Sequence, residues 1–469
     1  MPLFAPDNPR PLHFMGVAGA GMSGLALLAR KRGVAVTGCD RDPSAAGALE
    51  AVADVRRAGG VVFAGHSPEH VEQARALVVS SAVPRDHPEV ERARALGIPV
   101  VRRAEALAEA VSAGLLVAIS GTHGKTTTTA MTVEALAAAG LDPTGLVGGR
   151  ISAWGGNALI GGVDIFVVEA DEYDKSFLAL KPKVAVINNV EPDHLECYNS
   201  SVEELEAAFA AFADGARTVI VGGDDPGALR VAKALGRTVW RVGFADTAEV
   251  RISRLSQNSE GTSAFVSLPN GRRINLRLSV PGLHNVRNAA AALAVAVDLG
   301  ADTGEVLESL AAFQGVGRRF DVVGAAGDVV VVDDYAHHPS EIAATVEAAR
   351  QAYPGRRLVA VFQPHLYSRT QAMGVAMGAA LRGVDVAVVA DVYPARESPI
   401  PGVTGRLVAN AAEGGDAEVY WVPARKELVG RLAGLVEAGD VVLTMGAGDV
   451  TAVGPGLLDV LRRREGSPA

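Results

Sequence analysis

The stretch LLVAISGTHGKTTTT, residues 115–129, constrains the fold of this 469-residue chain more than any other. An apolar run breaks into a glycine loop and continues as a run of threonines, which predicts a β-strand, a phosphate-binding loop and a helix. Backbone N–H groups of such a loop point at phosphate, and the N-terminus of the helix adds a favourable dipole. Lys125 would then reach the β- and γ-phosphates of a nucleotide, and the Thr126 hydroxyl would ligate Mg²⁺. The rest of the predicted loop consists of Gly121, Thr122, His123, Gly124 and Thr127.

The spacing of this motif departs from the usual GxxxxGK[ST] pattern. Its first glycine would fall at Ile119, but the chain has it at Gly121. The variant favours a particular branch of ATP-using enzymes over a GTPase or a motor. The alternative is a strand-to-helix turn with an incidental lysine, but lysine is scarce next to arginine in this chain, which argues against chance.

A second glycine loop lies near the start of the chain, in HFMGVAGAGMSGLALLARKRGVAVTGCD. The spacing Gly19-x-Gly21-x-x-Gly24 after a short apolar run fits a loop that binds the diphosphate of a nucleoside, and Asp40 lies where a ribose-binding acid is expected. Alone this motif is weak, and a tight strand-to-helix turn without a ligand is the alternative. Two nucleotide-type loops in one chain suggest a nucleotide-linked substrate at the first and ATP at the second.

Apolar, β-branched runs alternate with helical stretches along the whole chain, which predicts an α/β protein with mainly parallel sheets. We expect three domains: a Rossmann-like domain over residues 1–111, a central P-loop ATPase-type domain over 112–320, and a Rossmann-like domain over 321–469. Short alternating stretches between Arg251 and Ser279 predict a small antiparallel insertion in the central domain.

The composition excludes several classes of protein. A net charge of −9 and only 5% aromatic residues argue against a general nucleic-acid binder. Two cysteines are too few for a disulfide framework or a CxxC metal site. We find no N-terminal signal and no apolar run long enough to span a bilayer, so we expect a cytoplasmic protein without a membrane partner. The oligomeric state is left open.

Two residues at the ends of predicted central strands are candidate metal ligands. Glu169 ends an apolar strand and would be a second Mg²⁺ ligand opposite Thr126. His194 follows the next strand in NNVEPDH and would ligate a second metal or contact a phosphate. The alternatives are a solvated carboxylate for Glu169 and a hydrogen-bonded structural histidine for His194.

Polar clusters in the second half of the chain add further candidates. GLHNVRNAAAA offers Asn285 and Asn288 as amide partners for adenine or ribose, although both could be turn or cap residues. Arg319 in GRRF could clamp a phosphate from the start of the third domain. DDYAHHP places Asp334, His337 and His338 at a strand end, and FQPHLYSRT adds His365 and Arg369, the latter a candidate for an anionic substrate.

Taken together, these motifs resemble the Mur ligase family, in family order from about His13 to Asp449. The motifs are GVAGAGMSG, GTHGKTTTT, EADEYDKSF, NNVEPDH, GLHNVRNA, RRF, DDYAHHPSEI, FQPH and GAGD. The resemblance implies three domains that bind a UDP-linked substrate, ATP and an amino acid. It also implies Mg²⁺- and ATP-dependent amide formation through an acyl phosphate, in peptidoglycan precursor synthesis. The most similar branch joins L-alanine to UDP-N-acetylmuramate; the alternative branch attaches a murein tripeptide to UDP-N-acetylmuramate in recycling.

The resemblance also implies roles for individual residues. Lys125, His123, His194 and His337 would be catalytic. Gly19, Gly21 and Ser23 would meet the UDP diphosphate, with Asp40, His66, Ser80 and Ser81 nearby. ATP would meet the central loop together with Asn285, Asn288, Arg319 and Asp334, while His337, His365 and Arg369 would meet the muramate or the alanine.

Two departures from the family pattern bear on these roles. No lysine lies between Lys183 and Lys233, so the metal bridge that a carbamylated lysine forms in many members is absent or replaced, and the alanine-adding branch is thought to do without it. Leu366 replaces the arginine of FQPHRY, which weakens the case for anion contact there.

Two alternative functions outside the family remain: a nicotinamide oxidoreductase built on the first glycine loop, and a non-catalytic nucleotide-binding regulator.

Overall fold

The computed structural model describes residues 2–44, 48–258, 261–395 and 397–465. These residues divide into two compact units. The first unit contains residues 1–255, 264–277 and 286–314, and the second contains 256–263, 278–285 and 315–469. None of the described helices is long and apolar enough to cross a lipid bilayer.

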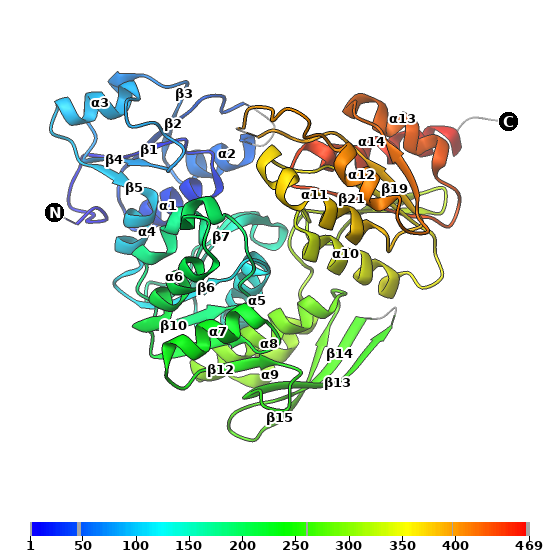
Figure 1. The fold of residues 1–469 in the computed structure, drawn as a ribbon. Helices are drawn as coiled ribbons and strands as arrows, with labels where there is room; N and C mark the ends of the chain where they lie inside the picture. Colours follow the sequence, from blue (N-terminus) through cyan, green and yellow to red (C-terminus); the bar gives the residue numbers. More distant parts are fainter. Residues whose placement is uncertain (1, 45–47, 259–260, 396, 466–469) are drawn as a thin grey trace. The chain divides into compact units, whose positions relative to one another are not determined.

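The N-terminal domain is a parallel five-stranded sheet in the order β3-β2-β1-β4-β5, flanked by helices (Figure 1). Its strands are β1 (Leu12–Met15), β2 (Val36–Asp40), β3 (Val61–Ala64), β4 (Ala76–Val79) and β5 (Val100–Arg102). Its helices are α1 (Ala20–Lys31), α2 (Leu49–Arg57), η1 (Pro68–Val71), α3 (Pro88–Ala95) and α4 (Arg103–Val111). The order reverses at β1, so the glycine loop that follows this strand lies at the topological switch point, where ligands bind in such sheets.

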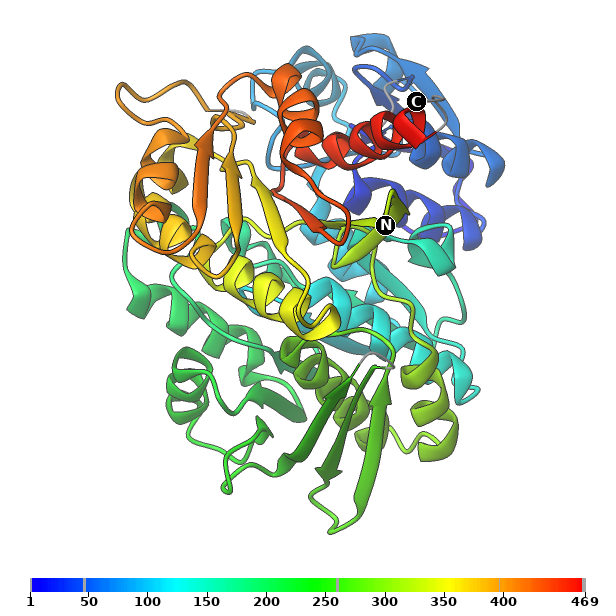
Figure 2. The same cartoon turned by 90° about the vertical axis from the view of Figure 1, so that its right-hand side faces the viewer.

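The central domain is built on a ten-stranded sheet in the order β15-β14-β13-β12-β11-β10-β6-β9-β7-β8. Its strands are β6 (Leu115–Ser120), β7 (Thr144–Ile151), β8 (Gly156–Leu159), β9 (Ile165–Glu169), β10 (Val184–Ile187), β11 (Thr218–Gly222), β12 (Trp240–Gly243), β13 (Val250–Asn258), β14 (Gly261–Ser267) and β15 (Arg273–Leu278). Its helices are α5 (Lys125–Ala138), η2 (Ser152–Trp154), η3 (Tyr173–Ala179), η4 (Leu195–Tyr198), α6 (Val202–Asp214), α7 (Pro226–Leu235), α8 (Leu283–Asp298) and α9 (Thr303–Ala312). The predicted insertion corresponds to β13, β14 and β15 at one edge of the sheet (Figure 2), where alternate residues of β14 and β15 are buried.

The C-terminal domain is a six-stranded sheet in the order β16-β17-β21-β18-β19-β20, parallel except for the β16–β17 pair. Its strands are β16 (Asp321–Ala326), β17 (Val329–Asp334), β18 (Leu358–Phe362), β19 (Val386–Val389), β20 (Glu418–Trp421) and β21 (Val441–Met445). Its helices are α10 (Pro339–Ala352), α11 (Tyr367–Leu381), α12 (Arg406–Ala412), α13 (Arg425–Leu435), η5 (Asp449–Ala452) and α14 (Val453–Glu465). Both faces of β18 are buried, Ala360 in one apolar cluster and Val359 in another, as expected of a doubly wound sheet.

One continuous apolar cluster joins the N-terminal and central domains. It includes Phe14 of β1, Leu146 of β7 and Phe166 of β9, all at least nine-tenths buried. Shared burial of this kind explains why two predicted domains form one compact unit, because separating them would return this apolar surface to water. The predicted fold class, three α/β domains with largely parallel sheets, is confirmed.

Candidate active site

The central phosphate loop lies between β6 and α5, as the sequence predicts. Gly121 and Gly124 have φ angles of 135° and 77°, which a residue with a side chain rarely adopts. Gly124 is the N-cap residue of α5 and has no side chain to cap the helix. The first turn of α5 contains no acidic residue of its own, so the positive end of the helix dipole faces the loop and the carboxylates at the end of β9.

Two asparagines at the end of β10 hold this loop in place. The Asn188 amide donates to the His123 carbonyl oxygen at 3.3 Å and to Thr128 Oγ1 at 3.0 Å. The Asn189 side chain accepts from the His123 N–H at 2.7 Å and donates to the His123 carbonyl oxygen at 3.2 Å. Sequence analysis missed the role of these asparagines within the NNVEPDH motif. The pairing of β10 with β6 brings them to the loop, and this pairing is visible only in the structure.

Lys125 is held by acidic residues that follow β9. Its ammonium donates to the Glu172 carboxylate at 2.7 Å and to the Gly121 carbonyl oxygen at 2.8 Å, and it lies 3.8 Å from Asp171. Glu172 is only 3% exposed. Burial lowers the pKa of Lys125, but the nearby carboxylates outweigh this effect and raise the pKa above its usual range, so the ammonium stays charged. Sequence analysis missed Glu172; its signal in the sequence was its place as the third of four acidic residues in the EADEYD motif.

Thr126 and Glu169 lie together, as predicted for a Mg²⁺ site. The Thr126 hydroxyl donates to Glu169 Oε2 at 2.9 Å, and the same oxygen accepts from the Gly148 N–H at 2.7 Å. Hydroxyl and carboxylate oxygens are ligands that Mg²⁺ prefers, so these residues fit the ion. Asn288 of α8 also lies at the loop, because a Cβ added at Gly124 would fall 2.6 Å from its Oδ1.

His194 has different neighbours from those of the Thr126–Glu169 pair. It lies 3.7 Å from Asp193 and 3.5 Å from Glu196, and its ring meets the Tyr173 ring edge-on at 5.0 Å between centroids. His194 has a left-handed backbone, with φ of 53°. Among the remaining predicted ATP contacts, the Asn285 amide donates to the Pro281 carbonyl oxygen at 2.6 Å, one turn before Asn288 on α8.

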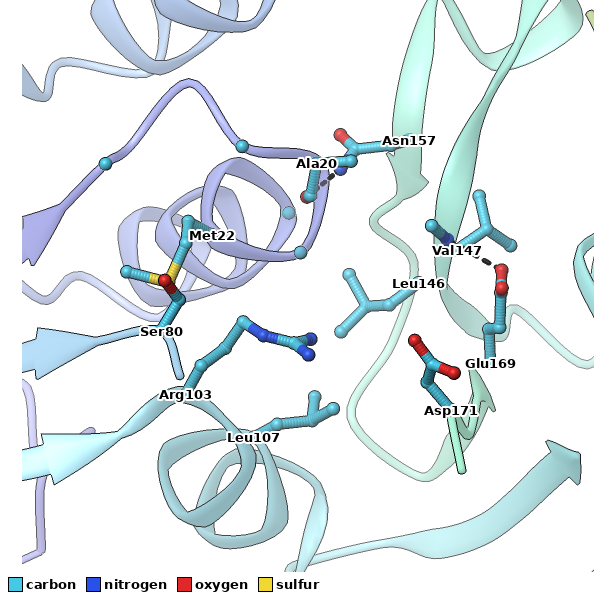
Figure 3. A pocket seen from close by; sticks show the side chains of 15 residues that line it. Ala20, Met22, Ser80, Arg103, Leu107, Leu146, Val147, Asn157, Glu169 and Asp171 are labelled. Atoms are coloured by element: carbon cyan, nitrogen blue, oxygen red, sulfur yellow. Dashed lines mark hydrogen bonds between the residues drawn. The ribbon is translucent and has the colours of Figure 1, made fainter. Parts of the chain in front are cut away.

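A pocket of about 320 Å³ links the N-terminal glycine loop to the end of β9 (Figure 3). The described residues that line it are Gly16, Gly19, Ala20, Gly21, Met22, Gly24, Ser80, Arg103, Leu107, Leu146, Val147, Gly148, Asn157, Glu169 and Asp171. Arg103 extends from α4 toward the glycine loop, opposite Glu169 and Asp171 (Figure 3). A Cβ added at Gly21 would fall 2.6 Å from its guanidinium, so the missing side chain leaves room for Arg103. Sequence analysis missed both Arg103 and Asn157.

The other predicted residues of the N-terminal domain differ in their surroundings. Asp40 accepts from the Ala18 N–H at 3.1 Å and so supports the glycine loop. The buried Ser23 hydroxyl donates to the Gly19 carbonyl oxygen at 3.2 Å. Ser81 is exposed, and His66 Nδ1 contacts Cys39 Sγ at 3.2 Å. Among the described residues, these four are outside the pocket lining, whereas Gly19, Gly21 and Ser80 belong to it.

The C-terminal candidates cluster within their own unit. The Arg369 guanidinium lies 3.4 Å from His365 Nδ1, and the His365 and His337 rings lie 5.9 Å apart. Arg319 contacts Glu341 at 3.4 Å. His337 Nδ1 is 2.9 Å from the Tyr335 carbonyl oxygen, which can only accept, so this nitrogen carries the proton.

Burial sets the protonation of two of these groups. It lowers the pKa of His337 to about 4, against the opposing effect of Glu341, so the imidazole is neutral near pH 7. Burial raises the pKa of Asp334 to about 6, although Arg319 lowers it. Asp334 also accepts from the Phe320 N–H at 2.7 Å and the Ala336 N–H at 2.8 Å, which ties the start of the domain to the end of β17.

Three family models match consecutive parts of the chain. Residues 11–114 match the "Mur ligase family, catalytic domain", residues 119–296 the "Mur ligase middle domain", and residues 318–448 the "Mur ligase, glutamate ligase domain". The chain belongs to the Mur ligase family.

Three similar proteins all belong to one branch of the family, the UDP-N-acetylmuramate–L-alanine ligases. The chain is 43% identical to the UDP-N-acetylmuramate–L-alanine ligase of Streptomyces avermitilis, with 98% of both chains covered. It is 46% identical to the Kineococcus radiotolerans enzyme of the same name, over 97% of this chain and 96% of that one. The crystal structure of the Thermotoga maritima UDP-N-acetylmuramate–alanine ligase matches with a TM-score of 0.81 at 28% identity, over 97% of this chain and 100% of that chain.

The Lys125–Glu172 pair leads to a prediction about stability. Lys125→Met removes the ammonium but keeps the apolar stem, and it leaves the Glu172 carboxylate buried without its cation. We expect the free energy of unfolding to fall by about 3–5 kcal/mol and turnover to fall on the order of 10³-fold. The double variant Lys125→Met/Glu172→Gln removes the stranded charge, so it should regain stability but not turnover. Urea unfolding and phosphate release measure the two effects.

The stability deficit of Lys125→Met should also depend on pH. Burial raises the pKa of Glu172 in the folded protein, and without Lys125 no ammonium opposes this effect. The folded variant then binds the proton more tightly than the unfolded chain, whose glutamate pKa is about 4.3. The deficit should therefore be small below that pH and grow as the pH rises through the raised pKa. A pH-independent deficit, or a double variant as unstable as the single one, would contradict the assignment.

The contact between Thr126 and Glu169 leads to a prediction about metal dependence. Glu169→Gln keeps the shape of the side chain but removes a hard oxygen ligand and its charge, so half-maximal activity should require more Mg²⁺. Asp164→Asn, an exposed position just before the opposite end of β9, is the matched control and should leave the Mg²⁺ titration unchanged. If the midpoint of the titration stays the same in Glu169→Gln, Glu169 is not a ligand.

Proposed function

We propose that this chain joins L-alanine to the carboxylate of UDP-N-acetylmuramate, with ATP as the phosphoryl donor, in cytoplasmic peptidoglycan precursor synthesis. The observation that carries the proposal is the pocket that runs from the first glycine loop to the end of β9. One end is lined by Gly19 and Gly21, and the other by Glu169, which is hydrogen-bonded to Thr126 of the phosphate loop. A UDP-sugar whose diphosphate lies at the first loop can direct its sugar toward the γ-phosphate of ATP at the second.

The chemistry explains why ATP is needed. A carboxylate is a poor acyl electrophile, because its charge repels nucleophiles and oxide is a bad leaving group. A muramate carboxylate oxygen therefore attacks the γ-phosphorus, the bond to ADP breaks, and an acyl phosphate forms. The uncharged amine of alanine then attacks the carbonyl carbon, and phosphate leaves with the bonding electron pair.

Residues of the phosphate loop would stabilise the charge of the transferring phosphoryl group. The Lys125 ammonium is charged and lies at the N-terminus of α5, where backbone N–H groups also face phosphate. Thr126 and Glu169 are the proposed ligands of Mg²⁺, which neutralises phosphate charge when bound. His123, whose Nε2 lies 3.4 Å from Glu191, is proposed to contact the phosphates beside Lys125.

The C-terminal cluster is proposed to receive the muramate and the amino acid. Arg369 is 7% exposed and supplies a positive charge for a carboxylate. The neutral His337 can accept a proton on its Nε2, because Nδ1 carries the proton shared with Tyr335. Arg319 and Asp334 are proposed to contact ATP, as are Asn285 and Asn288.

The direct test is phosphate release with ATP, Mg²⁺ and UDP-N-acetylmuramate against a panel of amines. We expect turnover with L-alanine and little with L-glutamate, with the murein tripeptide or without an amine. Preference for the tripeptide would favour the recycling branch, a member of which, from Psychrobacter arcticus, shares this fold at 24% identity and a TM-score of 0.70. A rate of phosphate release that is the same with and without UDP-N-acetylmuramate and the amine would overturn the proposal.

The Arg103 side chain leads to a prediction about the UDP end of the pocket. Because it lies against Gly21, we propose that it contacts the diphosphate. Arg103→Gln should raise KM for UDP-N-acetylmuramate about tenfold or more while leaving KM for ATP unchanged, since remote binding energy is lost. Arg94→Gln, an exposed arginine of α3, is the control. Equal effects of Arg103→Gln on both substrates would remove this role.

A further inference from the structure

A cluster of four potential metal ligands lies in the N-terminal domain. It contacts His66, whose Nδ1 is 3.2 Å from Cys39 Sγ, but contains none of the residues predicted to be catalytic. It consists of His13 of β1, Cys39 of β2, His70 of η1 and Glu89 of α3, and one ligand atom from each lies within 4.8 Å of the others. His13, Cys39 and Glu89 are fully buried, and the His70 side chain is 17% exposed.

The topology of the sheet brings these residues together. β1 and β2 pair in parallel with His13 opposite Thr37, and Cys39 follows Thr37 by two residues, so His13 and Cys39 point to the same face. His70 and Glu89 come from η1 and α3, two helices that pack against each other. Four separate elements therefore converge on one buried point.

The His13 ring has the arrangement of a metal ligand. Its Nδ1 lies 2.8 Å from Thr37 Oγ1, while its Nε2 is buried and has no hydrogen-bond partner among the described residues. Leaving a buried polar atom unsatisfied costs free energy. Histidines that bind a metal through one nitrogen use the other to contact a neighbouring polar group, which fixes the ring, as Thr37 does here.

The Glu89 carboxylate lies at the centre of the cluster. It accepts from the Ser67 N–H at 2.7 Å, lies 3.3 Å from Cys39 Sγ, and lies 3.3 Å from His70 Nδ1. None of these described partners carries a permanent positive charge, although a fully buried carboxylate ordinarily has one nearby. The His70 ring is fixed by stacking on Phe63, with 4.4 Å between centroids.

We propose that His13, Cys39, His70 and Glu89 bind one Zn²⁺ ion as a structural site. Two imidazoles, a thiolate and a carboxylate match the ligands of zinc, whereas Mg²⁺ prefers oxygen alone. Four protein ligands leave no open position for catalysis. On binding, the metal replaces the proton on Cys39 Sγ, and that proton goes to solvent.

The distances are compatible with this site. In a tetrahedral zinc shell, neighbouring ligand atoms lie roughly 3.3–3.8 Å apart, given metal–ligand bonds of about 2.0–2.3 Å. Glu89 Oε1 lies 3.4 Å from Cys39 Sγ and 3.3 Å from His70 Nδ1, so both of these pairs already fall in that range. All ligand atoms of the cluster lie within 4.8 Å of one another, so the widest pair needs to close by at most about 1 Å. The Cys39 carbonyl oxygen accepts from the N–H groups of Gly16 at 2.8 Å and Val17 at 3.0 Å, so the ion would also steady the first glycine loop.

The experiment uses the full-length chain, in which Cys39 and Cys197 are the two cysteines. In Cys197→Ser, Cys39 is the only cysteine and therefore the only source of a thiolate. Metal-free Cys197→Ser titrated with Co²⁺ should show a near-ultraviolet thiolate-to-cobalt charge-transfer band that saturates at one ion per chain. Zn²⁺ should abolish the band and raise the temperature of unfolding, and Mg²⁺ should do neither. Cobalt at Thr126 and Glu169 cannot give this band, because neither residue carries sulfur.

Substitutions at the other ligands locate the ion. In the Cys197→Ser background, His13→Gln and Glu89→Gln should weaken binding at least about tenfold. Glu191→Gln, an acidic residue beside the phosphate loop, should not. Failure of folded Cys197→Ser to bind Co²⁺ or Zn²⁺ stoichiometrically would overturn the site. A charge-transfer band that persists in Cys39→Ser would also overturn the site. The same holds if neither His13→Gln nor Glu89→Gln changes the affinity for the metal.

Discussion

The phosphate loop depends on a balance of charge between α5 and the segment after β9. Lys125 contacts Glu172 at 2.7 Å, and Thr126 contacts Glu169 at 2.9 Å. These two pairs join the first turn of the helix to the neighbouring strand of the sheet. They also place the loop's cation among carboxylates, so in the proposed complex the ATP phosphates would compete with the protein's own acids for Lys125. Such competition makes a divalent cation useful, because it reduces repulsion between the triphosphate and the acidic strand end.

The first glycine loop and the acidic end of β9 belong to the same compact unit. The N-terminal and central domains share one apolar cluster, so the glycine loop after β1 and the carboxylates after β9 are held in one body. Asn157 of β8 donates to the Ala20 carbonyl oxygen, which joins the two domains beside the pocket. A shared core between the two glycine loops suits the proposed phosphoryl transfer, because that reaction needs atoms of two substrates in line.

The two glycine loops share the same local structure at the helix that follows each of them. Helices α1 and α5 both have glycine as the N-cap residue and no acidic residue in the first turn. Each helix therefore presents its positive dipole end without a capping side chain, a suitable arrangement for phosphate. They differ in the cation supplied: α5 provides its own Lys125, whereas Arg103 reaches the first loop from α4.

The sequence by itself determined the fold class, the phosphate loop with Lys125 and Thr126, and the family. These depend on local order along the chain: a strand, a glycine loop and a helix are adjacent residues, and each shows its own pattern. It also indicated Glu169 as the partner of Thr126, because polar residues at the ends of parallel strands meet at one edge of the sheet. Only the tertiary structure revealed Glu172, Asn188 and Arg103, because strand pairing and helix packing decide which side chain reaches a distant loop. The cluster of His13, Cys39, His70 and Glu89 could not be predicted from the sequence for the same reason. Its residues lie far apart in the chain and come together only when β1, β2, η1 and α3 pack.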